Sequence, residues 1–492
     1  MKFRISYLRA MPLVEKYEAV IGLEVHTQLL TKSKLFCGDS TTFGSAPNTN
    51  ISAISLAHPG TLPVMNKKAI DFAIMLGLAF NCDIARNNYF ARKNYFYPDL
   101  PKGYQVSQHT TPICKNGYVT INIDGVARNI ILNRIHLEED AGKSLHDADE
   151  NYTCIDLNRA GVPLLEIVSE PDMHSSEEAF AYVTEIRKIV RFLKICDGNM
   201  EEGSMRCDAN ISIRLRGENK LGTKVEVKNL NSIRNVKRAI DFEIKRLISL
   251  VENGDRVIQQ TRSFDASNGT TFSLRDKEEA NDYRYFPEPD LTPFFITDDK
   301  IEEIKKTLPD LPAALEKKFI EKYSLPLADA KVLCDDRETA AFFENIIAHT
   351  NKHKQVANWI LGPIKSYLND TNITVDHLPL NPKTFAKLIE IVEQGSVSFG
   401  VAASKIFPVL LKFPEKEPID IARELNLLLE KNDDSLNNWI DEVLSKMPDK
   451  VSEYKKGKKN LIGLFSGEVK KISKGKADMQ AVNKMLNQKL NQ

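Results

Sequence analysis

Three segments in the first half of the chain alternate apolar and polar residues with the period of two that is typical of a β-strand with one buried face. The first is Ile21–His26, where Glu24 and His26 share one face. The second covers residues 205–214, and its polar face carries Arg206, Asp208, Asn210, Ser212 and Arg214. The third covers residues 223–228, with Lys224, Glu226 and Lys228 on one face. Such rows are usually solvent faces, on edge strands above all, but three in one domain predict a lined cleft able to hold phosphates and a divalent cation.

Helix and turn signals accompany these strands. Ser175 followed by Glu178 has the spacing of a capping box and precedes an apolar run, and a second helix is predicted from Ser232 to Gly254. Asp124-Gly125 between two alternating runs predicts a tight hairpin over residues 119–131. The pattern predicts an α+β domain with a mixed, largely antiparallel sheet.

The composition changes after Pro289, where Lys, Glu, Leu and Ile begin to dominate, and from about residue 300 prolines separate short helical segments such as residues 301–307 and 385–394. A further break falls at residues 413–418, Phe-Pro-Glu-Lys-Glu-Pro. A chain of 492 residues is also too long for a single core. We therefore predict an N-terminal extension (residues 1–16), an α+β domain (17–298), an all-α helical domain (299–415) and a basic helical tail domain (416–492).

Several acidic residues stand in apolar surroundings. Glu166 lies inside the run Leu164–Val168, where a carboxylate is costly unless a cation or a proton compensates it. Either a bound cation or a structural ion pair with Arg or Lys would serve. A strand through His136 ends in Glu138, Glu139 and Asp140, and strand alternation places His136 and Glu138 on one face and Glu139 on the other.

The charge is balanced overall but not along the chain. Lys plus Arg equals Asp plus Glu, with 67 residues of each kind, so the net charge indicates no partner. From Lys450 to Gln492, however, eleven lysines face three acidic residues, a net charge of +8. This segment is either an electrostatic footprint for phosphates or a basic, solvated helix surface.

The seven cysteines are odd in number and include no CxxC pair, which argues against a disulfide framework and favours a reducing cytoplasm. No apolar stretch reaches the roughly 18 residues of a membrane span, and we expect no membrane association. Standard signatures are also missing. Gly142-Lys143-Ser144 resembles the end of a phosphate-binding loop, but Leu137 occupies the position of its first glycine. There is no G-x-G-x-x-G, H-E-x-x-H or G-x-S-x-G either, so the residues alone do not name a reaction.

Seven motifs in the first 290 residues occur in a characteristic order: Val20–His26, Arg92–Asp99, His136–Lys143, Glu166–Asp172, Met200–Asn210, Lys228–Ser232 and Asp282–Asp290. Two more, Tyr454–Lys458 and Lys474–Ala477, lie in the basic tail. Together they resemble the family of the B subunit of aspartyl/glutamyl-tRNA(Asn/Gln) amidotransferase. The resemblance implies a catalytic "cradle" domain, a helical domain and a tail that contacts tRNA.

The resemblance also implies a reaction, that of an ATP-dependent carbon–nitrogen ligase with glutamine as amido donor. Glutamate or aspartate misacylated onto tRNA is activated as an acyl phosphate, and ammonia then displaces the phosphate. Transfer of a phosphoryl group to a carboxylate requires cations that neutralise the charge on both reactants. The expected cofactors are therefore ATP and Mg²⁺.

By this resemblance the catalytic residues are Glu24, His26, Glu139 and Glu166, and the Mg²⁺ ligands are His26, Glu139 and Glu166. The assignment of Glu139 conflicts with strand alternation, and a β-bulge before Asp140 would remove the conflict. Two further groups follow from the resemblance: Lys93, Arg206, Asp208 and Asn210 around ATP or the aminoacyl end, and Lys455, Lys456, Lys458 and Lys474 against tRNA. For Tyr95, Tyr97, Tyr283 and Tyr285 we expect core packing, with stacking on the terminal adenosine as the alternative.

One departure from the family concerns zinc. Many members carry four cysteines as a zinc knuckle after the first strand, whereas here Cys37 is followed by Asp39, Ser52 and Ser55. One thiolate does not make a structural zinc site, so we expect no zinc and a loop held by packing.

The expected partners are the amidase, or A subunit, which would supply ammonia through a channel, the small C subunit, and misacylated tRNA. Nothing in this chain resembles the Ser-Ser-Lys machinery of the family's glutaminase. Two alternatives remain at this point: a non-catalytic tRNA-binding scaffold, which would not need Glu24, His26, Glu139 and Glu166 together, and a stand-alone carboxylate ligase.

Overall fold

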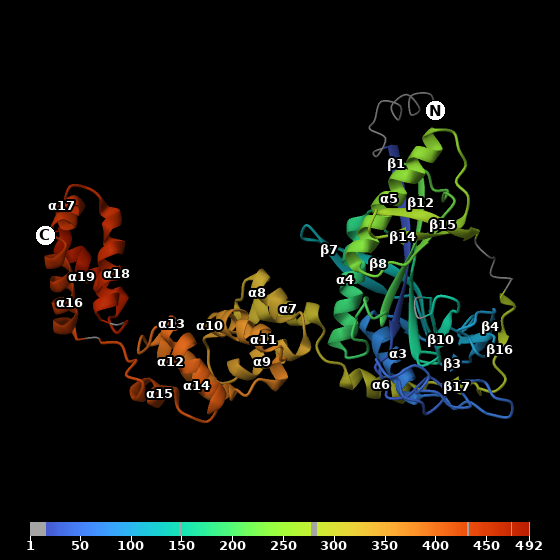
Figure 1. The fold of residues 1–492 in the computed structure, drawn as a ribbon, viewed down its shortest axis with the longest axis horizontal. Helices are drawn as coiled ribbons and strands as arrows, with labels where there is room; N and C mark the ends of the chain where they lie inside the picture. Colours follow the sequence, from blue (N-terminus) through green and yellow to red (C-terminus); the bar gives the residue numbers. More distant parts are fainter. Residues whose placement is uncertain (1–15, 147–148, 277–282, 431, 474, 492) are drawn as a thin grey trace. The chain divides into compact units, whose positions relative to one another are not determined.

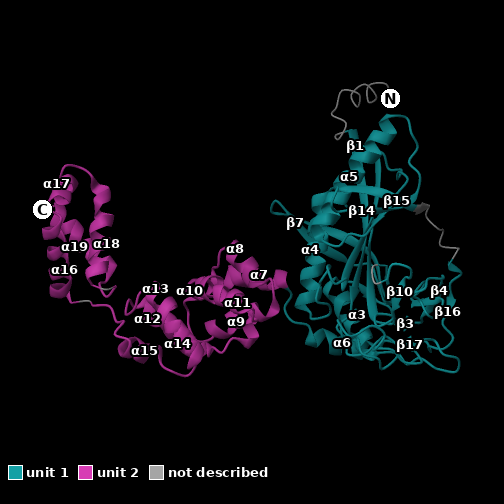
Figure 2. Ribbon diagram, viewed as in Figure 1, with its two compact units in different colours: residues 1–311 teal, residues 312–492 magenta. Residues whose placement is uncertain are grey.

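The computed structural model describes residues 16–146, 149–276, 283–430, 432–473 and 475–491. The chain divides into two compact units, residues 1–311 and 312–492 (Figure 2). Of the predicted N-terminal extension, only Lys16 belongs to the described residues. The predicted α+β class, with a sheet in the first half and helices in the second, is confirmed (Figure 1).

The first unit is built on a ten-stranded sheet. Its strands, in sheet order, are β15 (Thr270–Asp276), β14 (Gln260–Asp265), β13 (Val225–Lys228), β12 (Met205–Leu215), β1 (Tyr17–Gln28), β11 (Pro163–Ser169), β8 (Val126–Glu139), β6 (Cys114–Lys115) and β2 (Asp83–Ile84), with β7 (Tyr118–Ile123) paired to β8. Neighbours run antiparallel except β13 and β14, which run parallel. The predicted hairpin is confirmed, since Asp124 and Gly125 take the positive φ angles of a tight turn between β7 and β8.

Strand β1 lies in the middle of this sheet, between β11 and β12, and is therefore no solvent-exposed edge strand. Its apolar side chains, among them Ile21, Leu23 and Val25, are fully buried in the core. The helices α3 (Lys67–Ala79), α4 (Ser176–Phe192) and α5 (Ile233–Glu252) share this core (Figure 1). The polar side chains of the same strands consequently face the other way, away from the core.

The two predicted helix starts are confirmed. Ser175 accepts a hydrogen bond from the Glu178 backbone N–H at the start of α4, and Ser232 accepts one from the Asn235 N–H at the start of α5. The Glu178 carboxylate reaches back to the backbone N–H of His174, one residue earlier than in a standard capping box. The caps therefore mark the starts of the two helices, α4 and α5, that pack in the core.

Short strands stand beside the main sheet. Strands β4 (Ala91–Asn94), β5 (Tyr104–Ser107) and β16 (Phe286–Pro287) form one small sheet. Strands β3 (Asn87–Asn88) and β17 (Phe294–Phe295) form a second one, and β9 (Lys143–Leu145) pairs with β10 (Cys154–Asp156). Among these, β4 and β5 carry residues of the functional site.

The helix predicted to open the helical domain does not belong there. Helix α6 (Asp298–Thr307) contacts α3 and contributes Ile301 and Ile304 to the core of the first unit. Its apolar face fits this core, so the first unit extends to Leu311 instead of residue 298.

The named elements of the second unit, residues 312–492, are all helical within its described part. They are α7 (Pro312–Tyr323), α8 (Leu327–Leu333), α9 (Arg337–Ile347), α10 (His353–Trp359), η2 (Ile360–Ile364), α11 (Lys365–Thr371), η3 (Val375–His377), α12 (Pro382–Glu393), α13 (Phe399–Val401), η4 (Ala402–Ile406), α14 (Phe407–Lys412), α15 (Pro418–Glu424), α16 (Asp433–Lys446), α17 (Pro448–Lys455), η5 (Lys459–Leu461), α18 (Ile462–Ile472) and α19 (Met479–Asn491). Helix α15 contacts α12, whereas α16 to α19 enclose a separate core that includes Leu436, Phe465 and Leu486. The predicted tail boundary at residue 416 therefore precedes a helix that packs on the helical part.

The seven cysteines are free thiols, and all but Cys154 are buried. No helix of the described residues is long and apolar enough to cross a membrane.

A cross-strand ion pair helps to hold the register of β1 against β12. Glu18 lies directly opposite Arg214, whose Nε donates to the Glu18 carboxylate at 2.7 Å. This hydrogen bond lowers the pKa of Glu18. A group with a lowered folded-state pKa adds stability above its unfolded pKa, about 4.3 for Glu, and that stability is lost as the pH falls through the folded-state pKa.

We expect Glu18→Gln to lower the unfolding free energy by about 1 kcal/mol at neutral pH, the upper end for a cross-strand pair. The difference from wild type should shrink below about pH 4.3, as measured by urea unfolding across pH. Glu201→Gln, at an exposed carboxylate before β12, is the matched control. A difference that persists undiminished at about pH 2 would contradict this role for the ion pair.

Candidate catalytic cleft

The polar face of the sheet carries four charged or ionisable residues in one row across four strands. His26 on β1 lies directly opposite Glu166 on β11 and Arg206 on β12, and Glu166 lies opposite His136 on β8. Glu24, two residues before His26, lies opposite Asp208 on β12. Period-two alternation therefore brings residues that are far apart in the sequence into one row.

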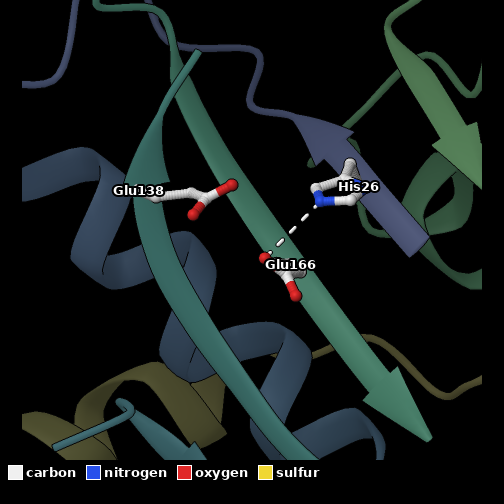
Figure 3. Close-up of side chains that lie close together, drawn as sticks. All are labelled: His26, Glu138 and Glu166. Atoms are coloured by element: carbon white, nitrogen blue, oxygen red, sulfur yellow. Dashed lines mark ion pairs between the residues drawn. The ribbon is translucent and has the colours of Figure 1, made fainter. Parts of the chain in front are cut away.

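Glu166 is the centre of a carboxylate–imidazole group (Figure 3). Its Oε2 lies 3.5 Å from Nε2 of His26 and 3.1 Å from Nε2 of His136. Glu138 joins from β8, with its Oε2 3.3 Å from the same nitrogen of His136. Ligand atoms of His26, Glu138 and Glu166 all lie within 4.8 Å of one another, an arrangement that could hold a metal ion.

The charges in this group depend on one another. Burial alone would lower the pKa of His136, but the Glu166 and Glu138 carboxylates raise it to about 9. Burial likewise opposes a charge on His26, and its hydrogen bond to Glu166 raises its pKa above the usual value. Burial would raise the pKa of Glu166, yet His136 and His26 hold it well below its usual range. Histidines, rather than the Arg or Lys of an ordinary ion pair, therefore compensate the buried carboxylate.

The structure does not bring Glu139 into this group. Its carboxylate accepts hydrogen bonds from Lys102 Nζ and, at 2.7 Å, from the backbone N–H of Val106 on β5. The pairing of β8 with β11 runs without a shift from Arg134 to Glu139, so no bulge turns Glu139 towards His26. Strand alternation decides the matter: Glu138 faces the cleft and Glu139 faces away from it. The sequence pattern contained this signal, and the resemblance overrode it.

A second group contains only carboxylates. Glu24, Asp208 and Glu226 also bring ligand atoms within 4.8 Å of one another. Lys228 Nζ lies 2.9 Å from Asp208 and 3.5 Å from Glu226, so a lysine already compensates part of this charge. Burial and the neighbouring Glu166 carboxylate raise the pKa of Glu24.

Arg206 lines the cleft, and Asn210 holds one of the lining carboxylates. Asn210 Nδ2 donates to Glu24 at 2.9 Å, while its buried Oδ1 has no hydrogen-bond partner among the described residues. Arg206 Nη2 lies 2.8 Å from Asp140, whose other oxygen accepts from Gln28. Arg206 is therefore held by a buried carboxylate, which fixes its place beside the His26 row.

One cavity of about 690 Å³ is lined by both groups of potential metal ligands, that of His26, Glu138 and Glu166 and that of Glu24, Asp208 and Glu226. The sheet supplies one wall, with Glu24, His26, Glu138, Glu166 and Asp208. The other wall comes from β4, β5 and the segment before β16, with Lys93, Tyr95, His109, Tyr283 and Tyr285. Tyr95, Tyr283 and Tyr285 are thus cavity-wall residues instead of core residues, and Tyr97 is 51% exposed.

The donor sets fit divalent cations. Carboxylates suit Mg²⁺ and Mn²⁺, and an imidazole is accepted by borderline ions such as Mn²⁺. The group of His26, Glu138 and Glu166 offers two carboxylates and one imidazole, and the group of Glu24, Asp208 and Glu226 is a hard oxygen set beside the unpartnered Oδ1 of Asn210. Both sets therefore fit ions of the Mg²⁺ and Mn²⁺ type.

The loop after β1 is held by hydrogen bonds as well as by packing. The Cys37 thiol donates to the Asp39 carboxylate at 3.3 Å, and the Ser55 hydroxyl donates to the same carboxylate oxygen. Although burial opposes it, the hydrogen bond from Ser55 contributes to an Asp39 pKa below its usual value. An ionised carboxylate thus closes the loop together with one thiol and one hydroxyl.

The tail lysines lie at the surface of a small helical core. Lys455 ends α17, Lys456 and Lys458 follow it, and all three are exposed. Lys458 Nζ lies 3.1 Å from Glu453. Lys474, the fourth predicted tRNA contact, lies outside the described residues.

The fold and the cleft define a class of protein: an α+β catalytic domain with a carboxylate-rich cleft, followed by helical modules with a basic end. Residues 19–302 match the family described as the GatB/GatE catalytic domain, and residues 341–490 match the GatB domain. The chain therefore belongs to the GatB family.

Relatives share this arrangement over nearly their whole length. A protein of Thermodesulfovibrio yellowstonii is 48% identical over 471 residues, which cover 96% of this chain and 98% of that protein. One from a Geobacter species is 49% identical over 479 residues, covering 96% and 99%. One from Geotalea uraniireducens is 48% identical over 480 residues, covering 97% and 100%. All three are named as the B subunit of aspartyl/glutamyl-tRNA(Asn/Gln) amidotransferase.

Proposed function

We propose that this chain is the B subunit of a tRNA-dependent amidotransferase and that it carries out the ATP-dependent activation step of the reaction. The substrate would be Glu-tRNA(Gln), Asp-tRNA(Asn) or both. The observation that carries the proposal is the group of His26, Glu138 and Glu166 beside the carboxylates of Glu24, Asp208 and Glu226 in one cavity. Family membership over nearly the whole chain supports it.

The reaction consists of two transfers. The side-chain carboxylate of the misacylated residue attacks the γ-phosphorus of ATP, so that an acyl phosphate forms and ADP leaves. Ammonia then attacks the carbonyl carbon, the bond between that carbon and the phosphate oxygen breaks, and phosphate leaves. The nitrogen loses a proton, and Glu24 is the cleft carboxylate best suited to accept it, because burial raises its pKa.

Cations decide whether the first transfer is possible, since both reactants are anions. The lysine and arginine side chains that line the cavity alongside these carboxylates are Lys93, Arg134, Arg206 and Lys228. Mg²⁺ held by His26, Glu138 and Glu166, or by Glu24, Asp208 and Glu226, would neutralise phosphate charge and orient the phosphoryl group. Glu138 takes the place that the resemblance gave to Glu139.

The rest of the assembly follows from the family. Ammonia would come from an amidase, the A subunit of the complex, and a small C subunit would complete the assembly. Lys455, Lys456, Lys458 and Lys474 would contact tRNA through its phosphates. The seven free thiols fit a reducing compartment, the cytoplasm. A non-catalytic scaffold has no use for two groups of metal-ligand type in one cavity, which favours catalysis in this chain.

The test measures ADP formation by the full chain together with its partner subunits, with ammonium chloride as nitrogen donor so that glutaminase activity is not required. We expect ADP release to depend on misacylated Glu-tRNA and a divalent cation. His26→Ala should slow it about 10- to 100-fold, because one ligand of the cavity group is lost. Unchanged ADP formation and Gln-tRNA synthesis in this variant, with normal tRNA binding, would instead favour the scaffold role.

A further inference from the structure

Lys93 on β4 has unusual surroundings for a lysine. Its Nζ lies 5.0 Å from the ring centre of Tyr283 and 5.8 Å from that of Tyr95. Within the described part of the chain it makes no ion pair or hydrogen bond. Burial alone would lower the pKa of Lys93, but Glu138, Tyr285 and Glu166 raise it above its usual value. The cavity wall therefore holds a permanent cation among aromatic rings, without a directly bound anion.

The rings around Lys93 are held in place. The Tyr95 and Tyr283 ring centres are 6.1 Å apart in an edge-on arrangement, and Tyr285 stacks on His109 with centres 4.1 Å apart. Asn94 Nδ2 donates to the backbone carbonyl of Arg284 at 2.7 Å. Strand β16 pairs with β4, and the Arg92 guanidinium forms two hydrogen bonds of 2.8 Å with Glu288. The aromatic wall is thus a rigid part of the small sheet.

On the opposite wall of the cavity, by contrast, two cations are paired with carboxylates. Lys228 is already paired with Asp208, and Arg206 is paired with Asp140. Arg134, the fourth cation of the cavity, donates to the Asn133 side chain at 2.9 Å. Among the described lysines and arginines that line the cavity, only Lys93 lies over aromatic rings. A partly buried cation without a direct partner is stabilised when an anion binds beside it, and aromatic faces favour the methylene groups of an aliphatic chain over a highly hydrated polyphosphate.

Resting on the proposed function, we infer that Lys93, with Tyr95 and Tyr283, forms the receptor for the side-chain carboxylate of the misacylated residue and distinguishes this substrate from the amide product. The carboxylate accepts a hydrogen bond from the ammonium group of Lys93, and the side-chain methylenes pack on the tyrosine rings. The position lies in the same cavity as the group of His26, Glu138 and Glu166, where phosphoryl transfer to that carboxylate would occur.

The receptor would also assist release of the product. Amidation replaces the anionic oxygen by NH₂, so the product carries no charge for Lys93 and offers it only a neutral carbonyl oxygen. A hydrogen bond between charged partners is stronger than one to a neutral group. The wall should therefore bind the carboxylate substrate more tightly than the amide that replaces it.

The test compares the dissociation constants of Glu-tRNA(Gln) and Gln-tRNA(Gln) for the full chain in complex with its partner subunits, without ATP. We expect wild type to prefer Glu-tRNA(Gln) by about tenfold or more, the equivalent of one charge-assisted hydrogen bond. Lys93→Met should bring the ratio close to one by weakening substrate binding alone. Lys93→Arg should keep a preference, which separates the charge from side-chain packing.

Lys228→Met is the matched comparison, because it removes a lysine from the opposite wall. It should raise the KM for ATP and leave the preference for Glu-tRNA(Gln) unchanged, whereas Lys93→Met should leave the KM for ATP unchanged. A preserved preference in Lys93→Met, an equal affinity of wild type for both tRNAs, or a raised KM for ATP with an unchanged preference would each overturn the inference. Failure of the proposed function would appear separately, as a wild-type complex that forms no ADP with Glu-tRNA(Gln).

Discussion

A Glu166→Gln variant is expected to lose turnover by about 100- to 1,000-fold, the range seen when a group that stabilises transition-state charge is removed. Glu166 forms an ion pair with His26 (Figure 3), and the same carboxylate oxygen lies 3.1 Å from Nε2 of His136, so this oxygen organises the whole group. Glutamine keeps the shape of the side chain but removes the charge. His26 and His136 then lose the anion that raises their pKa, and an ion bound there loses a carboxylate ligand.

The measurement is single-turnover formation of Gln-tRNA with ammonium chloride, accompanied by the dissociation constant for tRNA and a circular-dichroism spectrum. Glu170→Gln is the control, because Glu170 follows the same strand and its carboxylate accepts from Asn133 without lining the cavity. We expect this control to turn over as wild type does. Full activity in Glu166→Gln, with normal tRNA binding, would place the chemistry elsewhere in the cleft.

The second large effect separates two adjacent glutamates. We expect Glu138→Gln to raise the Mg²⁺ concentration needed for half-maximal activity by about 10- to 100-fold, because a carboxylate that faces the cleft is lost. Glu139→Gln should leave this concentration unchanged and instead lower the unfolding free energy by about 3 kcal/mol, because it leaves the Lys102 ammonium buried without its carboxylate. Mg²⁺ titration of activity and urea unfolding provide the two measurements.

The two variants check each other, since they make the same substitution at neighbouring residues. A shift of the Mg²⁺ requirement in Glu139→Gln equal to that in Glu138→Gln would restore the assignment made from the resemblance. It would also mean that β8 changes register when substrate binds, because a one-residue slip exchanges the two faces of a strand.

The clearest agreement between sequence and structure lies in the central strands. The alternation of Ile21–His26 and of residues 205–214 predicted one apolar and one polar face. In the structure, β1 and β12 bury the apolar face in the core and turn the polar face away from it. Local chemistry was sufficient here, since a period of two in a strand leaves each side chain only one of two directions. The helix caps at Ser175 and Ser232 are likewise local, because a side chain and a backbone N–H three residues later form each of them.

The sequence did not predict contacts between residues that lie in distant parts of the chain. No local pattern indicates that Lys102 pairs with Glu139, that Arg206 is held by Asp140, or that α6 packs on α3. Tyr95 and Tyr283 are separated in the sequence by more than half of the first unit, and the pairing of β16 with β4 is what brings them together around Lys93.

The sequence by itself thus determined the fold class, the family, the strand faces and the presence of a polar cleft, because periodicity and ordered motifs are properties of short segments. Strand alternation already placed Glu138 and Glu139 on opposite faces, but the tertiary structure alone decided which residues each of these carboxylates meets. It joined Glu138 to His26 and Glu166, sent Glu139 to Lys102, and left Lys93 facing aromatic rings. The physical reason is that the compensation of a buried charge depends on distances between strands, and strand order and register set those distances.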